Sequence, residues 1–333
     1  MVNFSSNNNL NTDLNISETG LNIHDFNGYR EKQNLHAYFV TGYTDGDGSF
    51  SIRVRKSKTN KIGFTVGLVY SIGAEANIEN LNLLKKVQNF FGGVGSISKC
   101  GGNMYIYEVS SLKSLNIIIS HFENYPLETT KIIYFKLWTE IVKMMFKKEH
   151  LTKRGFIKIL RIKSVFPKGL NENIKLIYPK IKPIIKPTFL ASMRMLNLYW
   201  ISGFSQADSS FGLNCTRVVS TKLGWTFQPQ FRVTQHERDL VVLKRMLLTL
   251  GCGGLVKPSI GRDRYNFSVS NRKDLINIII PHFKKYPIYG AKLLDFKDFV
   301  KGLDIIRNKE HLTWIGLNKL KEWALNMNRG RIF

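Results

Sequence analysis

The sequence predicts an α+β protein built from two similar halves, each with the element order αββαββα, in a pseudo-twofold arrangement. The first observation is a short motif that occurs twice, at residues 38–50 and at residues 199–211. In each copy, an apolar run with helical spacing contains a small residue followed by glycine, ends in an acidic residue and leads into strand-like sequence. We interpret each copy as a helix that delivers one carboxylate to a shared centre.

The second observation is a constant offset between matching residues along the chain. The matching pairs, each separated by 161 positions, are Asp47 and Asp208, His121 and His282, Lys131 and Lys292, and His150 and His311. Pairs at one spacing in so many segments indicate a duplication. Because there are two copies, the chain is not a solenoid array, which needs at least three.

The elements of the first half can be followed in order. Helical spacing from residue 35 to residue 43 changes at residue 49 to an alternation of apolar and polar residues, which is typical of a half-buried strand. A polar turn then leads to a second strand, and Gly92 and Gly93 end the helix that follows. The second half repeats the order. The predicted elements are strands at 49–55 and 64–72, a helix at 78–91, hairpin strands at 94–98 and 105–109, and helices at 112–122 and 130–146.

The charge of the chain indicates a polyanionic partner. The 333 residues carry 49 Lys and Arg against 24 Asp and Glu, a net charge of +25, which causes self-repulsion unless a polyanion offsets it. Nucleic acid is the expected partner. A membrane is disfavoured, because the chain has neither an apolar run long enough to cross a bilayer nor an evident basic amphipathic helix. The 3 cysteines form no CxxC pair, which excludes a disulfide framework and a zinc site made of cysteines alone.

Composition divides the chain into four parts. Residues 1–30 are rich in Asn and Ser without periodicity, as expected of a disordered leader. The first repeat is expected at 31–150 and the second at 196–333. Between them, residues 151–195 are expected to form a linker with one helix at 156–165 and then a stiff stretch with repeated proline.

The paired motif has the residues that a two-metal centre needs. Gly42 and Gly203 remove side-chain bulk, so the motif helices can pack closely and bring Asp47 and Asp208 together. Two such carboxylates repel each other unless a divalent cation neutralises them, and hard oxygen ligands with room for water and phosphate favour Mg²⁺. Two metal ions about 3.5–4 Å apart are the usual arrangement for phosphodiester hydrolysis. A strongly basic protein with this centre is expected to be a nuclease.

The predicted strands carry side chains suited to DNA on the faces that point away from the core. Gln, Asn and Arg read base edges in the major groove, and Lys and Arg neutralise phosphates. Strands of roughly ten residues cover about ten base pairs, so two sheets form a saddle for a nearly palindromic site of about 20 base pairs. The candidate DNA-binding residues are Ser51, Arg53, Arg55, Lys61, Thr65, Ser71, Asn214, Thr216, Gln228, Gln230, Arg232 and Thr234.

These two stretches resemble the paired motifs of single-chain LAGLIDADG homing endonucleases. The similarity extends from about residue 35 to residue 330, and the ending Leu-Asn-Met-Asn-Arg-Gly-Arg at 325–331 resembles that of the monomeric fungal mitochondrial branch. The resemblance implies a monomeric, site-specific double-strand DNA endonuclease that is intron-encoded and mitochondrial. It also implies Mg²⁺ as the cofactor, with Mn²⁺ able to substitute and Ca²⁺ bound without supporting cleavage.

The resemblance further implies roles for individual residues. Asp47 and Asp208 occupy the metal-binding position of the motif. The other roles are backbone carbonyl ligands at Gly46 and Ala207, polar residues beside the scissile phosphates at Ser71 and Arg232, and catalytic lysines at Lys113 and Lys273.

The second motif copy departs from the first at two positions. Gln206 replaces Asp45, and Ser209 replaces Gly48, where serine is costly if the backbone needs a positive φ or a close approach of DNA. Any difference between the two cuts is therefore expected first at the Asp208 copy. Two alternatives to the nuclease use the same fold and basic surface: an RNA-binding maturase that helps its own intron to splice, and a DNA-binding protein that does not cleave.

Overall fold

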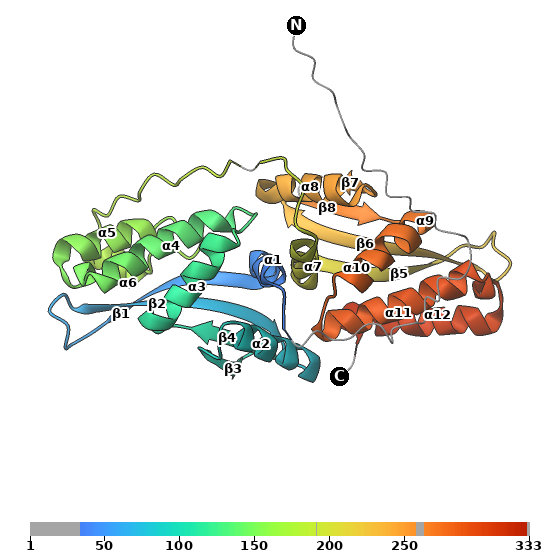
Figure 1. Ribbon diagram of the computed structural model, residues 1–333, viewed down its shortest axis with the longest axis horizontal. Helices are drawn as coiled ribbons and strands as arrows, with labels where there is room; N and C mark the ends of the chain where they lie inside the picture. The colour runs from blue at the N-terminus through green and yellow to red at the C-terminus, as the bar shows by residue number, and fades with distance from the viewer. Residues whose placement is uncertain (1–33, 191, 258–262, 332–333) are drawn as a thin grey trace, which may run out of the picture.

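Two halves with the same element order lie side by side, and their motif helices α1 and α7 meet at the boundary between them (Figure 1). The computed structural model describes residues 34–190, 192–257 and 263–331, so the predicted leader at 1–30 lies outside the described residues. The elements of the first half are α1 (Ala37–Asp47), β1 (Gly48–Lys56), β2 (Phe64–Glu75), α2 (Ile78–Phe90), β3 (Ser96–Cys100), β4 (Met104–Val109), α3 (Leu112–Asn124), α4 (Lys131–Phe146), α5 (Lys153–Lys163) and α6 (Glu172–Ile177).

The second half repeats these elements, with a π-helical turn at Leu275–Ile279 between two short helices where the first half has α3. Its elements are α7 (Leu198–Asp208), β5 (Ser209–Arg217), β6 (Trp225–His236), α8 (Leu240–Leu250), β7 (Gly254–Val256), β8 (Arg264–Val269), α9 (Arg272–Asp274), α10 (Ile280–Lys285), α11 (Gly290–Arg307) and α12 (Trp314–Asn326). Within the described residues, no helix has the length and apolar content that crossing a membrane requires.

Each half contains one four-stranded antiparallel sheet. The strand orders are β1-β2-β4-β3 and β5-β6-β8-β7, so the hairpins of each half join through β2 with β4 and β6 with β8. Gly48 pairs with Ile72, and Ser209 pairs with Val233, which places the first residue after each acid inside its sheet. The predicted α+β fold with two duplicated halves is confirmed.

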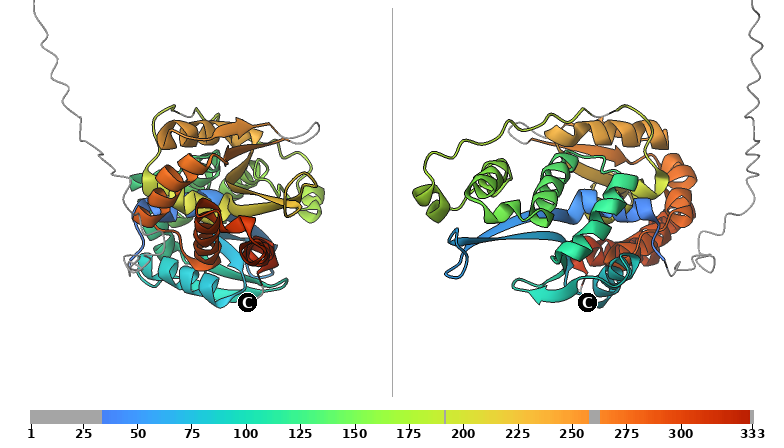
Figure 2. Two further views of the ribbon diagram at one scale, coloured as in Figure 1. Left: turned by 90° about the vertical axis from the view of Figure 1, so that its right-hand side faces the viewer. Right: turned by 60° about the vertical axis from the view of Figure 1, so that its left-hand side comes forward.

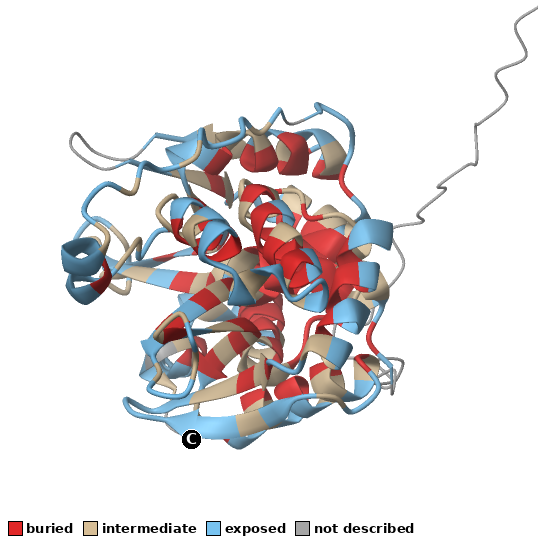
Figure 3. Cartoon of the chain, turned by 90° about the vertical axis from the view of Figure 1, so that its left-hand side faces the viewer, coloured by how far each residue is buried: buried red, intermediate tan, exposed pale blue. Residues whose placement is uncertain are grey.

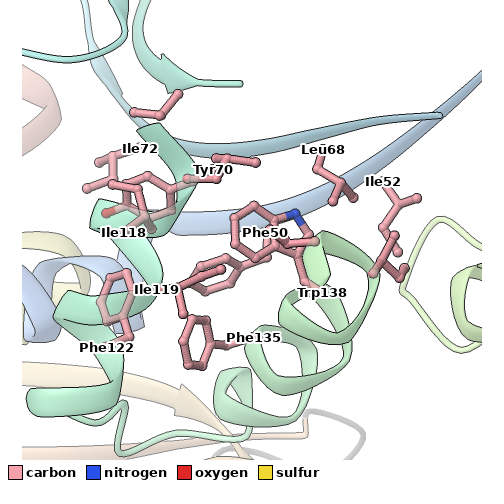
Figure 4. Close-up of a cluster of buried hydrophobic side chains, with 14 of the residues drawn as sticks. Phe50, Ile52, Leu68, Tyr70, Ile72, Ile118, Ile119, Phe122, Phe135 and Trp138 are labelled. Atoms are coloured by element: carbon pink, nitrogen blue, oxygen red, sulfur yellow. The ribbon is translucent and has the colours of Figure 1, made fainter. Parts of the chain in front are cut away.

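In each half, an aromatic cluster packs helices on one face of the sheet, and Figure 4 shows that of the first half. Phe50 of β1 lies 5.6 Å from the ring of Phe122 on α3 and 5.4 Å from that of Trp138 on α4. In the second half, Phe211 of β5 takes the same place, 5.3 Å from Phe283. Strand residues alternate between this buried face and an open face, because successive side chains of a strand point to opposite sides. The open faces of both sheets are therefore available to a ligand.

The predicted linker at 151–195 contains two helices that belong to the first half. Phe156 and Ile159 of α5 and Ile174 of α6 are buried in the core of that half. The second half has the equivalent helix α12, whose Leu317 and Leu320 are buried in its own core. An amphipathic helix thus extends the first half beyond residue 150, as α12 extends the second half beyond residue 311. An extended connection follows α6 along one side of the molecule (Figure 2).

Matched contacts join the halves on both sides of the motif helices. Asn80 Oδ1 accepts a hydrogen bond from the backbone N–H of Ala291 at 3.1 Å, and Asp239 Oδ1 accepts one from Thr130 at 2.7 Å. Thr130 and Ala291 are equivalent residues, so each half caps the first turn of a helix in the other half. Buried residues lie in the interior of the molecule, whereas exposed residues cover its outer helices and loops (Figure 3).

Removing Arg245 is expected to weaken this boundary. The guanidinium of this α8 residue lies 2.9 Å from Glu128, with side-chain exposures of 1% and 14%, and Nε donates to the Arg194 carbonyl at 2.8 Å. The substitution R245A leaves Glu128 with the exposed Arg194 as its charged neighbour. Breaking a buried pair costs about 3 kcal/mol or more. Calorimetry is expected to show a lower midpoint of thermal unfolding.

The equivalent contact on the other side supplies the control for this prediction. Lys86 Nζ lies 5.3 Å from the ring of Tyr289. Because a partly solvated cation–π contact contributes about 0.5–1 kcal/mol, K86A is expected to lower stability far less than R245A. Equal losses in the two variants would contradict the importance given to the buried ion pair.

Candidate active site and nucleic-acid interface

Two glycines allow the backbones of α1 and α7 to touch. A Cβ atom on Gly42 would lie 2.1 Å from the carbonyl oxygen of Trp200, and one on Gly203 would lie 2.0 Å from that of Phe39. These distances are shorter than any normal contact, so glycine is required at both positions. The predicted close packing of the motif helices is therefore present, and it carries Asp47 and Asp208 to the same end of the pair.

Asp45 and Gln206 hold equivalent positions in the two motif copies. They anchor α1 and α7 to the segments that precede α4 and α11. Asp45 accepts hydrogen bonds from the backbone N–H of Glu128 at 2.8 Å, the hydroxyl of Thr129 at 2.6 Å and the indole N–H of Trp200 at 2.9 Å. Burial raises the pKa of Asp45 to about 6, while these hydrogen bonds lower it. In the second copy, Gln206 Oε1 accepts from the backbone N–H of Tyr289 at 2.9 Å. Gln206 thus serves the equivalent segment without a charge.

Two hollows flank the ends of the motif helices and are related by the pseudo-twofold axis. The Asp208 hollow, of about 680 Å³, contains Asp208 of the second half and Lys131 of the first. The Asp47 hollow, of about 590 Å³, contains Asp47 of the first half and Lys292 of the second. Each hollow therefore combines an acid from one half with a lysine from the other.

Burial and neighbouring charges shift the pKa of both carboxylates. The Asp47 side chain is exposed to its hollow, but protein atoms surround it on the other sides. This desolvation and the charge of Asp208 raise the pKa of Asp47 to about 7. Desolvation also raises the pKa of Asp208, whereas the amide of Gln235, 2.6 Å away, lowers it. Lys131 and Lys292 oppose the rise at both acids. The centre therefore favours a further positive charge.

Lys131 and Lys292 are the lysines that the structure brings to this centre. Lys131 Nζ donates to the carbonyls of Thr44 and Gly46 in the last turn of α1 at 2.8 and 2.9 Å, and to the carbonyl of Gly48, the first residue of β1, at 2.6 Å. Lys292 Nζ donates to the carbonyl of Ser209 at 2.6 Å. Burial lowers the pKa of both lysines, and the surrounding carboxylates raise it.

The lysines matched by resemblance lie elsewhere. Lys113 is exposed in the first turn of α3, and Lys273 is exposed in α9 beside Ile276 and Arg307. Neither residue lines the Asp47 or the Asp208 hollow. The structure therefore does not bring these two candidates together with the acids, and their catalytic role stays a prediction.

Residue 48 and residue 209 differ because of the residues one turn earlier. Gly48 has φ −76° and Ser209 has φ −105°, so neither position needs a positive φ. A Cβ on Gly48 would lie 2.5 Å from Cγ2 of Thr44, a methyl group that Ser205 lacks, and also 2.7 Å from the Thr44 carbonyl oxygen, so both the methyl group and the local backbone exclude a side chain there. The Ser209 hydroxyl instead donates to the Ser205 carbonyl at 2.5 Å. Serine at position 209 thus satisfies the carbonyl that corresponds to one bound by Lys131.

A strand residue near Asp208 was missed in the sequence. Gln235, near the end of β6, donates to Asp208 Oδ2 at 2.6 Å and lines the Asp208 hollow. Arg232, the residue chosen from the resemblance, lies three positions earlier, and its guanidinium donates to Gln230. Ser71 lies opposite Ser49 and Glu108 in the first sheet. Alternation along β6 assigns Gln235 to the same face as the buried Phe231 and Val233, opposite to Arg232, so the pattern does not indicate a site residue there.

The candidate DNA-binding residues lie on the open faces of the sheets or in the adjoining turn. On β1, Arg53 and Arg55 are exposed while their neighbours Ile52 and Val54 are buried. On β6, Gln230 accepts from Arg232 and donates to Ser268 at 2.7 Å. The guanidinium of Arg53 also pairs with Glu108 on the same open face. Several polar side chains are thus held in position before any ligand arrives. The open-face candidates are Ser51, Arg53, Arg55, Thr65, Ser71, Asn214, Thr216, Gln228, Gln230, Arg232 and Thr234, and Lys61 lies in the turn between β1 and β2.

The donor atoms at the centre suit a hard divalent cation. Asp47 and Asp208 supply carboxylate oxygens, which are the hard ligands that such a cation prefers, and burial raises the pKa of both groups. The carbonyl of Gly46 already accepts from Lys131, which leaves its second lone pair for a metal. No cluster of three or more His, Cys, Asp or Glu side chains with metal-binding geometry occurs in the described part of the chain. Water and phosphate oxygens would therefore complete the coordination.

Similarity to known proteins agrees with this geometry. The chain matches the sequence pattern described as LAGLIDADG endonuclease at residues 40–142 and again at residues 201–303. It is 32% identical over 296 residues to "Probable intron-encoded endonuclease 3" of Neurospora crassa, covering 89% of this chain and 55% of that protein. It is 33% identical over 299 residues to "Probable intron-encoded endonuclease 2" of the same fungus, covering 86% and 64% respectively. The chain thus spans less than two thirds of the length of both relatives.

Solved structures match over nearly their whole length. The I-SmaMI LAGLIDADG homing endonuclease bound to cleaved DNA has a TM-score of 0.84 and 35% sequence identity, with 90% of this chain and 99% of that one covered. I-GzeII in complex with its DNA target has a TM-score of 0.82 and 32% identity, with 90% and 100% covered. Two sequence matches that coincide with the two structural halves assign the protein: the chain belongs to the LAGLIDADG endonuclease family.

Proposed function

We propose that this protein is a site-specific endonuclease that cuts both strands of a long DNA target. The main support is the pair of hollows, each of which contains an acid from one half and a lysine from the other. The hollows lie where two sheets with polar and basic open faces meet. The similarity to structures of DNA-bound homing endonucleases supports the same function. Double-stranded DNA is then the substrate, and one chain supplies both cutting centres.

Asp47 and Asp208 are proposed to hold divalent metal ions, with Mg²⁺ as the working cofactor. When bound, the metal ions lower the pKa of a water molecule and neutralise charge on the phosphate. The protein's own contribution is to fix the acids at the ends of two helices that cannot slide, and to aim Lys131 and Lys292 at the hollows. An ammonium beside a scissile phosphate stabilises the negative charge that develops during cleavage. Gln235 orients the Asp208 carboxylate through its hydrogen bond.

Metal selectivity provides the test of this function. A library of long double-stranded targets is expected to be cut in Mg²⁺ and in Mn²⁺, while Ca²⁺ is expected to support binding without cleavage. Ca²⁺ takes more ligands in a looser geometry than Mg²⁺, which suits retention of the substrate but not alignment of the attacking water. The structural relative I-SmaMI has been solved on uncleaved DNA in the presence of calcium ions. Specific binding in Mg²⁺ without any cut would favour the non-cleaving alternative.

The setting of the gene is proposed from the relatives. Both relatives described above are named as probable intron-encoded endonucleases of a fungus, which supports an intron origin for this chain, and we propose that the intron is mitochondrial. Intron RNA is then a further candidate partner. Splicing of the host intron in cells that lack the protein tests this role, because normal splicing would exclude a maturase.

A further inference from the structure

A carboxylate, Asp295, lies one helical turn after Lys292, whereas no carboxylate lies one turn after its counterpart Lys131. Asp295 follows Lys292 by three positions on α11, so both side chains lie on the same face of that helix. Asp295 is buried, with 4% of its surface exposed. Burial lowers the pKa of Lys292, and Asp295 opposes this more strongly than Asp47 or Asp208 does. Asp295 is therefore a competing partner for the Lys292 ammonium.

Two residues of the C-terminal segment, Asn328 and Arg331, donate hydrogen bonds to the Asp295 carboxylate. Arg331 donates to Asp295 Oδ1 through Nε at 3.1 Å and through Nη2 at 3.0 Å, and Nη2 also reaches Asp298 at 2.6 Å. The backbone N–H of Asn328 donates to the same Asp295 oxygen at 2.9 Å. The side chain of Asn328 donates to the Phe211 carbonyl at 2.8 Å, which ties the segment to β5. Arg331 and Asn328 both line the Asp47 hollow.

The first half has no equivalent of this arrangement. Tyr134 occupies the position that matches Asp295, and Lys131 donates to three carbonyls whereas Lys292 donates to one. Lys131 is thus held by three carbonyls, and none of the carboxylates that act on its charge (Asp45, Asp47, Asp208 and Asp239) lies on its own helix. Lys292 has a weaker hold on the helix end and a negative neighbour that must be neutralised by another group.

We propose that Arg331 is a positioning residue for one of the two strand cuts, because it neutralises Asp295 and so keeps the Lys292 ammonium directed into the Asp47 hollow. Without the guanidinium, Asp295 is a buried, poorly compensated carboxylate within reach of Lys292, and the ammonium turns towards it. The centre with Lys131 is untouched. This inference rests on the proposed endonuclease function and adds that the C-terminal segment controls one centre.

The test follows the two strands of a cleavable target separately, with a different fluorophore at each 5′ end, under single-turnover conditions in Mg²⁺. In R331A, one strand is expected to be cut about tenfold or more slowly while the other strand stays within about twofold, since a small misplacement of a catalytic group is enough for such losses. Target affinity is expected to be unchanged. K292M is expected to slow the same strand, and K131M the opposite strand.

The variant D295N/R331A separates positioning from loss of structure. Asparagine keeps the oxygen that accepts from Asn328 but removes the competing charge, so the slow strand is expected to recover most of its rate. A double variant as slow as R331A, or an R331A enzyme that slows both strands equally, would overturn the inference while leaving the proposed function in place. A wild-type protein that cuts neither strand in Mg²⁺ or Mn²⁺ would overturn the proposed function and this inference with it.

Discussion

Replacing Asp47 or Asp208 with asparagine is expected to reduce double-strand cleavage by at least about 10³-fold, which corresponds to the several kcal/mol of charge stabilisation that a catalytic metal supplies. Asparagine has nearly the same shape as aspartate, so the helix contact is preserved and the metal-binding charge is lost. Target binding is expected to be retained, because removing one of two mutually repelling carboxylates reduces repulsion of the phosphates. Band-shift titration in Ca²⁺ measures binding, and the two-colour strand assay measures cleavage.

The charge-matched control for this prediction is E237Q. Glu237 is exposed at the end of β6 and lines neither hollow, so this variant is expected to cut at the wild-type rate. Wild-type cleavage of both strands by D47N or by D208N would contradict the assignment of the acids. A variant that loses binding and cleavage together would show instead that the acid mainly supports the fold.

The second large effect is expected at the helix contact, where G203A should both destabilise the protein and abolish cleavage. The new Cβ would lie 2.0 Å from the Phe39 carbonyl oxygen and 2.8 Å from the backbone nitrogen of Tyr43. Backbone atoms cannot rotate aside as a side chain does, so α1 and α7 must separate. Overpacking of this kind costs about 3 kcal/mol or more, and displacing the acids by about 1 Å costs about 100-fold in rate.

Thermal unfolding and the strand assay measure the two parts of this prediction, and G254A is the matched control. Gly254 lies at the start of β7 with a negative φ, and a Cβ atom there would meet nothing within 4 Å. An alanine at position 254 is therefore expected to change neither stability nor rate appreciably. If G203A unfolds at the wild-type temperature, the contact between the helices is looser than the structure indicates.

The fold could be predicted from the sequence because its strongest signals are local or repeated. The change from helical to alternating spacing after Asp47 marks the helix and strand that the structure contains, and the recurrence of the pattern fixes the pairing of the halves. The need for glycine at 42 and 203 also follows from a repeated motif. The predicted linker contains α5, which packs in the core of the first half; its amphipathic spacing lies directly before a proline-rich stretch that favours a linker.

The candidate site was only partly predictable, and the lysines show why. Lys113, Lys131, Lys273 and Lys292 all lie in the first turn of a helix or close to it, where a positive charge opposes the helix dipole and so signals a special role. That signal is the same for all four residues. Only the turn of the chain before α4 and α11 carries Lys131 and Lys292 back to the ends of the motif helices. Gln235 was missed for another reason, because alternation along β6 assigns it to the core face with Phe231 and Val233, whereas at the end of the strand it reaches Asp208.

The contact between residue 44 and residue 48 restricts the order in which the two halves can have diverged after duplication. While Thr44 keeps its methyl group, a side chain at position 48 meets it at 2.5 Å, so a Gly48→Ser step taken first is unfavourable. A Thr→Ser step at the earlier position removes the methyl contact but leaves the carbonyl oxygen 2.7 Å from the new Cβ, so the backbone must also shift towards the geometry in which Ser205 and Ser209 fit together. A symmetric enzyme rebuilt from one half should therefore take both residues from the same half, either Thr44 with Gly48 or Ser205 with Ser209. A combination of Thr at the first position with Ser at the second would bring the threonine methyl group against the serine side chain.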